Sequence, residues 1–328
     1  MIDDVQHLRR FEDALNTLLN NSRLDVYVTG SNARFLSKDV VTTFRGRGDE
    51  IRVHPLSFAE YLSVQQPLPF AEQHLNEYMR LGGLQQQVMM NSEQQKRQYL
   101  SQLFANTYLV DIKERYAIKN DDDLEELIDV IASSIGSLTN PTKIANTFAS
   151  VKQSQLSKDT IKRYLDYMQD AFMIEKAMRY DIKGRKYIDT PAKYYFEDLG
   201  LRNARINFRQ TEPTHLMENL IYNELRVKGY SIDVGQVVAN TRNANGVSER
   251  KQLEVDFVCN KADERIYIQS AYAMPTPEKQ EQELKSLKLI NDSFQKVVIA
   301  GGMQPTYRNN DGILILNIYD FLLNKVTI

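Results

Sequence analysis

Two apolar runs near the end of the chain constrain the fold most. Residues 295–302 read QKVVIAGG and residues 312–323 read GILILNIYDFLL, and both runs are rich in β-branched side chains. Runs of this kind are typical of strands buried on both faces, because a strand with one exposed face alternates apolar and polar residues. They predict the buried strands of a mixed sheet in an α/β protein.

The composition is that of an ordinary folded protein. Of the 328 residues, 42% are apolar and 26% are charged, and the formal net charge is −2. This length predicts two or three domains, and this net charge argues against a whole-protein attraction to nucleic acid while it allows a local basic face. With one cysteine, no signal-peptide pattern and no apolar run long enough to span a bilayer, we expect a cytoplasmic protein without a membrane partner.

A pair of acids at the start of the chain indicates a phosphate site. Asp3 and Asp4 precede a helical pattern, and a strand end presents metal-binding or water-activating acids in this way. A second short strand is predicted over residues 24–28 and breaks into polar residues 29–32, and residues 44–48 read FRGRG. In the alternative interpretation, Asp3 and Asp4 are only exposed acids near a helix start.

The order of these motifs resembles the bacterial and archaeal family of AAA+-like P-loop ATPases that carries a C-terminal DUF4143 domain. The resemblance covers nearly the whole chain and includes HPLSFAEYL at residues 54–62 and YMRLGGL at residues 78–84. It implies ATP and Mg²⁺ as cofactors. By position, Asp3 would hold Mg²⁺, and Asp4, where the family usually has Glu, would orient the attacking water. Asn32 would sense the terminal phosphate, and Arg45 or Arg47 would offset its charge.

The phosphate loop of such ATPases does not occur in this sequence. The loop needs a Gly-Lys-Ser/Thr motif, because its backbone N–H groups surround the phosphates and its lysine reaches them. No Gly-Lys pair is found in the 328 residues. We therefore expect the family's preceding segment to have been removed, by a natural truncation or by the boundary of the fragment. ATP binding and hydrolysis would then be lost or very weak in this chain.

Two predicted helices and a hairpin in the middle of the chain form a winged helix-turn-helix pattern. The first helix begins after Asn140 and the second after Ser157, and residues 173–180 and 185–190 predict the two strands of the wing. If the pattern binds double-stranded DNA, the contacts would come from Lys158, Thr160, Lys162 and Arg163 on the second helix and from Lys183, Arg185 and Lys186 on the wing. In the alternative interpretation, the module contacts another protein and its basic residues are only solvated.

The last third of the chain has an acid on a predicted helix, Glu218, followed by an acid on a predicted strand, Asp256. This order resembles that of the PD-(D/E)XK nuclease fold, in which carboxylates hold Mg²⁺ at the scissile phosphate and a lysine positions water. The alternation of residues 253–260 places Leu253, Val255 and Phe257 on one face and Glu254 and Asp256 on the other. The third ligand position is Gln269, and Ala271 stands where the lysine would be.

Three interpretations of this last region stay open: an active nuclease, a metal site without turnover, and a structural remnant. Lys279, on the following predicted helix, is the one candidate for a migrated amine. The four histidines have no ligand-like spacing, so we predict no zinc site.

The motifs divide the chain into three predicted parts. A truncated P-loop AAA+-like module covers residues 1–90, a helical segment with the winged helix-turn-helix covers residues 91–190, and a restriction-endonuclease-like mixed-sheet domain covers residues 191–328. The K-x-Y-x-x-D-x-G-L motif at residues 193–201 is interpreted as the junction to the last part. The leading hypothesis is an ATPase-family protein that has lost nucleotide-dependent switching. The rivals are a non-enzymatic DNA-binding or scaffold protein and a metal-dependent nuclease.

Overall fold

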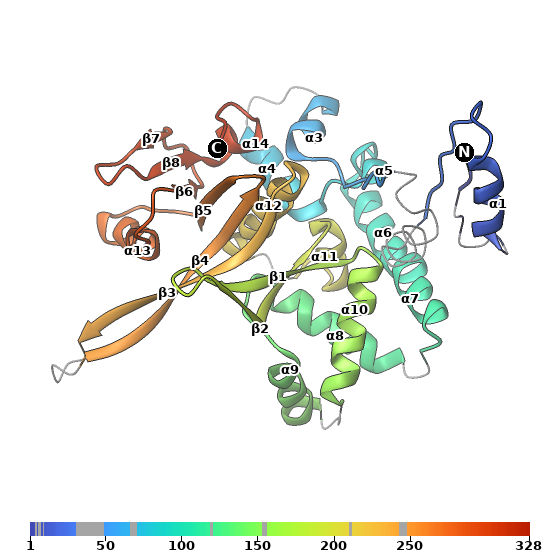
Figure 1. Ribbon diagram of the computed structural model, residues 1–328, viewed down its shortest axis with the longest axis horizontal. Coiled ribbons are helices and arrows are strands. Elements are labelled where there is room, and N and C mark those ends of the chain that lie inside the picture. Colours follow the sequence, from blue (N-terminus) through green and yellow to red (C-terminus); the bar gives the residue numbers. More distant parts are fainter. Residues whose placement is uncertain are drawn as a thin grey trace.

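One eight-stranded mixed sheet organises the protein (Figure 1). The structure is a computed structural model, and it describes residues 1–3, 5, 8, 10–30, 49–65, 71–118, 121–152, 156–209, 212–242 and 248–328. The strand order is β2-β1-β3-β4-β5-β6-β8-β7. The strands are β1 Ile174–Asp181, β2 Lys186–Phe196, β3 Ser231–Arg242, β4 Ser248–Lys261, β5 Glu264–Ala271, β6 Gln295–Ala300, β7 Tyr307–Arg308 and β8 Leu314–Asn317.

The two apolar runs form β6 and β8 inside this sheet. The two strands pair in parallel, and β6 also pairs in parallel with β5. Val298, Ile299, Ile315 and Leu316 are fully buried. The predicted α/β class with a mixed sheet is therefore confirmed.

The sheet is covered by helices on both faces, and each face has its own hydrophobic core. On one face, Tyr222 and Leu225 of helix α12 share a core with Phe257 and Ile299. On the other face, α13 contacts β4 and β5, and its Leu284 and Leu287 lie in a second core. The first core also contains side chains from α3 to α11, so the helices of the middle region pack on the same body as the sheet.

The helices are short, and several begin at caps that the sequence predicts. Asn140 accepts the N–H of Lys143 at the start of α9, and Ser157 accepts the N–H of Thr160 at the start of α10, as expected. The helices are α1 Phe11–Leu19, α3 Phe58–Val64, α4 Ala71–Leu81, α5 Gln85–Val88, α6 Glu93–Leu103, η3 Phe104–Leu109, α7 Val110–Arg115, α8 Asp121–Ser133, α9 Pro141–Thr147, η4 Phe148–Lys152, α10 Lys158–Asp170, α11 Leu199–Arg205, α12 Pro213–Val227, α13 Pro277–Lys288 and α14 Ile318–Leu322. No helix in the described ranges is long and apolar enough to cross a membrane.

The hairpin predicted as a wing is part of the sheet. Its strands β1 and β2 pair with each other as expected, but β1 also pairs in parallel with β3, where Arg179 lies opposite Val234. Strand β2 continues through Tyr194, Tyr195 and Phe196, because these aromatic residues are buried and favour strands. The predicted domain boundary after residue 190 thus falls inside β2, and the three-part division stays a prediction.

Asp198 connects the glycine-containing motif at residues 78–84 with the motif at residues 193–201. Its carboxylate accepts the N–H of Gly83 at 2.8 Å and the N–H of Leu201, at the start of α11, at 2.9 Å. Gly82 has a φ of +75°, and a Cβ atom there would collide with this carboxylate. Only glycine therefore fits at the end of α4, and the contact holds α4 against α11.

The N-terminal residues form a small unit of their own. Val5, Phe11 and Leu15 make a separate hydrophobic cluster together with Ile2 and Val28. Figure 1 shows α1 at the right-hand side, away from the sheet.

The ring of Phe58 is expected to be a main anchor of α3. It is fully buried and lies 5.6 Å from the Tyr78 ring in an edge-on contact. Phe58→Ala should lower the free energy of unfolding by about 3 to 5 kcal/mol, because a buried phenyl leaves a cavity. Urea denaturation measures this loss. Phe294→Ala, at a residue that is 41% exposed, is the matched control and should cost about 1 kcal/mol or less. Equal losses would contradict the assigned role of Phe58.

Candidate functional site

The start of the chain places Asp3 at the end of two parallel segments. Ile2 and Val28 form a parallel bridge, in which Ile2 donates its N–H to Tyr27 at 2.8 Å and Thr29 donates its N–H to Ile2 at 2.9 Å. The Thr29 hydroxyl donates a hydrogen bond to the exposed Asp3 carboxylate. Asp3 and Thr29 therefore meet at the end of the two parallel segments.

The other predicted nucleotide residues cannot be placed. Asp4, Asn32, Arg45 and Arg47 lie outside the described residues. The described N-terminal unit offers the Asp3 carboxylate for Mg²⁺, while the sequence has no Gly-Lys loop for the phosphates. These residues alone do not fit a complete ATP and Mg²⁺ site.

The structure brings Glu218 and Asp256 together around a lysine. Lys193 Nζ, on β2, lies 2.8 Å from Glu218 Oε1, 2.6 Å from Glu254 Oε1 and 3.8 Å from Asp256 Oδ1. We call these four residues the lysine–carboxylate cluster. Its Lys193 side chain is only 3% exposed. Since a buried charge needs partners, the three carboxylates are what allow this lysine to lie in the core.

The cluster is further tied by neighbouring donors. The Tyr195 hydroxyl donates to Glu218 Oε1 at 2.6 Å, and the Ser270 N–H donates to Asp256 Oδ2 at 2.8 Å. Burial and the Glu218 charge raise the pKa of Asp256 above its usual range. Burial works against the charged form of Lys193, but the carboxylates outweigh it and raise the pKa of Lys193. The ammonium is therefore charged at neutral pH.

The structure does not bring Gln269 to this cluster. Gln269 Oε1 accepts a hydrogen bond from Ser286 of α13 at 3.3 Å, and its neighbours Tyr267 and Ala271 belong to the core on the α13 face. Glu218 lies on α12, which covers the opposite face. Lys279 is also on α13, where it pairs with Glu283 at 2.6 Å. Within the residues that the structure describes, no group of three His, Cys, Asp or Glu side chains is arranged to hold a metal ion.

A bulge explains why the simple alternation in β4 fails. The register between β3 and β4 shifts between Asp233 and Gly235. As a result, Val255 packs in the α13-side core and Phe257 in the α12-side core, although the sequence places both on one face. An extra residue in one strand moves the side chains beyond it to the opposite face of the sheet.

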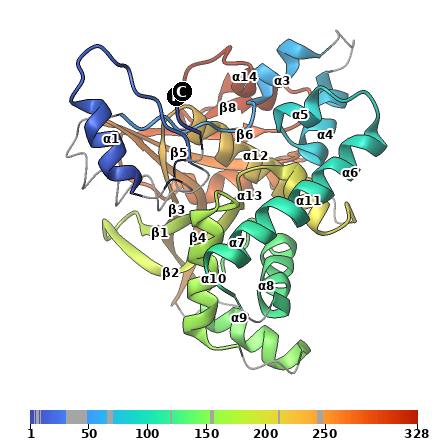
Figure 2. The ribbon, with the colours of Figure 1, turned by 90° about the vertical axis from the view of Figure 1, so that its right-hand side faces the viewer.

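The predicted DNA-contacting residues are exposed but do not form one surface. The side chains of Lys158, Lys162 and Arg163 on α10 and of Lys183, Arg185 and Lys186 in the β1–β2 turn are all exposed. Thr160 is half-buried, and its Oγ1 accepts a hydrogen bond from Arg163 at 3.3 Å. Figures 1 and 2 show the start of α10 near α9, apart from the β1–β2 turn.

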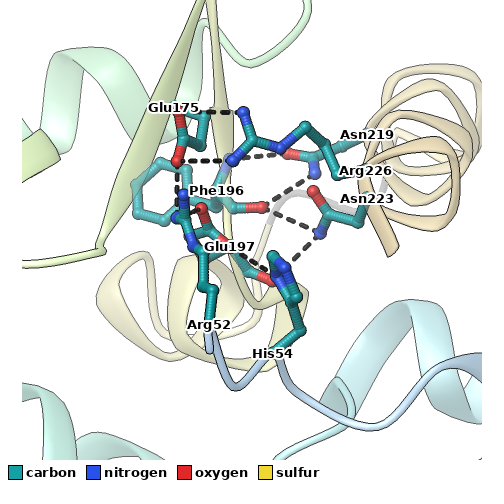
Figure 3. A network of polar contacts seen from close by, with 8 residues as sticks. All are labelled: Arg52, His54, Glu175, Phe196, Glu197, Asn219, Asn223 and Arg226. Atoms are coloured by element: carbon teal, nitrogen blue, oxygen red, sulfur yellow. Dashed lines mark hydrogen bonds and ion pairs between the residues drawn. The ribbon is translucent and has the colours of Figure 1, made fainter. Parts of the chain in front are cut away.

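A second ion cluster, which sequence analysis did not find, fixes residues 49–57 to the sheet (Figure 3). We call this segment the strap. Its Arg52 pairs with Glu175 of β1 and with Glu197 just after β2, and its guanidinium lies 4.8 Å from the Phe172 ring centroid. Arg226 of α12 pairs with Glu175 at 3.2 Å. Two carboxylates and two guanidinium groups thus neutralise one another at the sheet edge.

The same network continues into α12 through amide side chains. His54 Nδ1 lies 3.7 Å from Glu197 Oε2, and Asn223 donates to the carbonyls of Phe196 and Glu197 at 3.0 Å each. Asn219 donates to Phe196 O and accepts the Phe196 N–H (Figure 3). Burial raises the pKa of Glu175, with the neighbouring Glu197 adding to the shift, whereas the pKa of Glu197 is lowered because His54 and Arg52 outweigh the cost of its burial.

Glu224 of α12 binds the backbone just after the strap, and its titration predicts a pH effect. Glu224 Oε1 accepts the Phe58 N–H at 2.6 Å, and burial raises the pKa of Glu224 to about 7. Because folding raises this pKa, the contribution of Glu224 to stability is fully present below about pH 4.5 and is lost as the pH rises through about 7. The loss is up to about 3 kcal/mol at about 1.4 kcal/mol per pKa unit.

The variant Glu224→Gln keeps an acceptor for Phe58 and should remove this loss. Its free energy of unfolding relative to wild type, measured by urea denaturation, should rise between pH 5 and 8 by on the order of 2 to 3 kcal/mol. Glu264→Gln, at an exposed position, is the control. Parallel pH profiles for wild type and Glu224→Gln would contradict the prediction.

Comparison with known proteins places the chain in a family. It is 34% identical over 326 residues to an uncharacterised protein of Haemophilus influenzae, an alignment that spans 98% of this chain and 77% of that protein. The chain belongs to the same family. An uncharacterised protein of Methanocaldococcus jannaschii, MJ1544, is 26% identical over 323 residues, which span 90% of this chain and 70% of that protein.

Two domain families match separate regions of the chain. The AAA domain matches residues 1–62, which supports the predicted AAA-like ATPase family. A domain of unknown function, DUF8612, matches residues 72–212, and the DUF4143 assignment stays a prediction. The strap network joins these two regions, because Arg52 lies in the first match and Glu175 and Glu197 lie in the second.

A solved structure, that of protein VC1899 from Vibrio cholerae, aligns with 85% of this chain and 63% of that chain. The identity is 14% and the TM-score is 0.26. A likeness at this level does not assign a fold.

Proposed function

We propose that the protein is a member of the AAA-type ATPase family. In this proposal the N-terminal unit contacts the nucleotide, and the eight-stranded sheet with its helices, which we call the sheet body, moves in response. The observation that carries the proposal is the meeting of Asp3 and Thr29 at the end of two parallel segments, inside the region that matches an AAA domain. In P-loop ATPases, the metal-holding acid stands at such a strand end.

The strap, which follows the N-terminal unit in the sequence, is held on the sheet by ion pairs. Arg52 is part-buried and holds carboxylates that come from two different places on the sheet edge. Since part-buried charged hydrogen bonds are stronger than exposed ones, a displacement of the strap would be passed to β1 and β2 instead of being lost in a loose linker.

In this chain, nucleotide binding is expected to be very weak. Asp3 supplies one negative ligand, and the sequence has no phosphate-loop lysine to offset the charge of a triphosphate. Carboxylates beside a triphosphate repel it unless a metal ion or a basic group intervenes.

The protein is proposed to be cytoplasmic, and its sheet body is proposed to carry the DUF4143-type winged-helix and nuclease-like arrangement.

Binding of ATP should therefore be detectable only in the millimolar range and should depend on Asp3. In ¹H–¹⁵N spectra, Mn²⁺–ATP should broaden the amide signals of Asp3, Thr29 and Gly30 in wild type and not in Asp3→Asn, because the bound ion is paramagnetic. Asp25→Asn is the control, since Asp25 is an exposed acid in the same unit.

Two results would contradict the proposal. Calorimetry that gives micromolar binding of Mg²⁺–ATP would show that the phosphate site is complete, since millimolar affinity corresponds to only about −4 kcal/mol. Equal broadening in wild type and Asp3→Asn would show that the N-terminal unit does not face the nucleotide.

A second candidate function is binding of duplex DNA by the basic side of α10. It is supported by the exposure of Lys158, Lys162 and Arg163 at the start of that helix. The separation of the β1–β2 turn from this helix leaves α10 as the main contact in this hypothesis (Figure 2).

If α10 binds DNA, the affinity should fall steeply with salt, and Lys162→Ala should reduce the salt slope by about 1. Fluorescence anisotropy with a labelled duplex measures both effects. Lys325→Ala, at an exposed lysine near the C-terminus, should leave the slope unchanged. Binding that does not respond to salt, or that is equal in the two variants, would remove this candidate.

A further inference from the structure

We propose that the Lys193 ammonium takes the place of a divalent metal ion in the nuclease-like part of the sheet, so that the lysine–carboxylate cluster is closed to metals and has a structural role. This inference does not depend on the proposed ATPase function, because it concerns a different part of the chain.

The position of the ammonium is the first argument. Lys193 comes from β2, Glu218 from α12, and Glu254 and Asp256 from β4, and the single Nζ atom contacts all three carboxylates at 2.6 to 3.8 Å. A bound Mg²⁺ or Ca²⁺ would need to lie 2.0 to 2.6 Å from the same oxygens. Both cations cannot occupy that point, so the lysine excludes the metal while it remains there.

The remaining acceptor capacity of the carboxylates is the second argument. Glu218 Oε1 already accepts from Tyr195 as well as from Lys193, and Asp256 Oδ2 accepts the Ser270 N–H. A metal ion would have to displace these donors inside a region where Lys193, Glu218 and Asp256 are each less than 10% exposed. Removing donors from buried carboxylates is costly.

The residues that depart from the nuclease pattern fit the same interpretation. Gln269 faces α13, on the other side of the sheet, and Ala271 offers no amine. The site therefore lacks both the third ligand and the lysine of β5. A lysine from β2 supplies the positive charge that the two matching acids, Glu218 and Asp256, still need.

The rival interpretation is that Lys193 is a catalytic lysine beside a metal. A catalytic lysine needs access to water or substrate, whereas this side chain is 3% exposed and is held by carboxylates that a metal would require. The two interpretations make opposite predictions for the variant Lys193→Met, which keeps the length of the side chain and removes its charge.

In the proposed case, the wild-type protein should bind no Mn²⁺ at this cluster, and Lys193→Met should gain a site. Without the ammonium, three carboxylates repel one another, so the melting temperature of the variant should fall by at least about 5 °C. Millimolar MnCl₂ should restore it, with a Kd near or below about 1 mM by electron paramagnetic resonance. Lys279→Met, at an exposed ion pair with Glu283, is the matched control and should gain no Mn²⁺ binding.

A double variant covers the case in which Lys193→Met does not fold without metal. Lys193→Met combined with Asp256→Asn removes one of the repelling charges. It should recover folding without Mn²⁺ and should lose the gained metal site.

Three results would overturn the proposal. The first is Mn²⁺ binding by wild type that disappears in Asp256→Asn. The second is plasmid nicking by wild type with Mg²⁺ that is lost in Lys193→Met, which would identify Lys193 as catalytic. The third is a folded Lys193→Met that gains no Mn²⁺ binding. The first two results each need a folded variant. In wild type alone, Mn²⁺ that broadens the amide signal of Ser270, whose N–H donates to Asp256, would overturn the proposal without any variant.

Discussion

The rest of the structure depends on one constraint, which is that helix α12 covers one face of the sheet with polar side chains that need partners. Glu218 meets Lys193, and Arg226 meets Glu175. Asn219 and Asn223, between them on the helix, bind the backbone at the end of β2. An unpaired charge at such depth would cost more than the surrounding apolar contacts could return. The pairing therefore fixes how β1 and β2 lie against α12.

This constraint unites two features that the sequence shows separately. The lysine–carboxylate cluster and the ion cluster around Arg52 both involve α12, and residues 193–197, at the end of β2 and just after it, contribute to both. The motif interpreted as a junction is thus the strand that supplies Lys193 to one cluster and leads into Glu197 of the other. Its Asp198 also holds the glycine turn after α4. A short stretch of chain connects the sheet, the middle helices and the strap.

Much of the architecture could be predicted, because the signals were local. The apolar runs marked β6 and β8, and Asn140 and Ser157 marked helix starts, since a cap depends on a few neighbouring residues. The resemblance to a nuclease fold grouped Glu218 with Asp256, and both lie beside Lys193, while their predicted role as metal ligands stays a prediction. The side of the sheet on which Gln269 lies could not be predicted from the alternation of residues, because a bulge in a partner strand leaves no mark in the sequence of β5.

Lys193 and Arg52 were missed for a related reason. Lys193 stands in a motif interpreted as a domain junction, and Arg52 lies between two motifs of the family pattern. Each acts through residues at least 25 positions away. The available signal for Lys193 was its place directly before three aromatic residues in the sequence. It shows that a charge is paired, but not which carboxylate it meets, since that depends on the packing of α12 on the sheet.

The strap network also determines where the chain can be divided. The gap between the two family matches, residues 63–71, looks like a natural place to separate an N-terminal fragment from a C-terminal one. A cut there would remove Arg52 and His54 from the cluster. Of the cations drawn in Figure 3, Arg226 would then remain beside Glu175 and Glu197. It would also take Phe58 out of the core. An independently folding C-terminal fragment should therefore begin before residue 52, inside the region that matches the AAA domain.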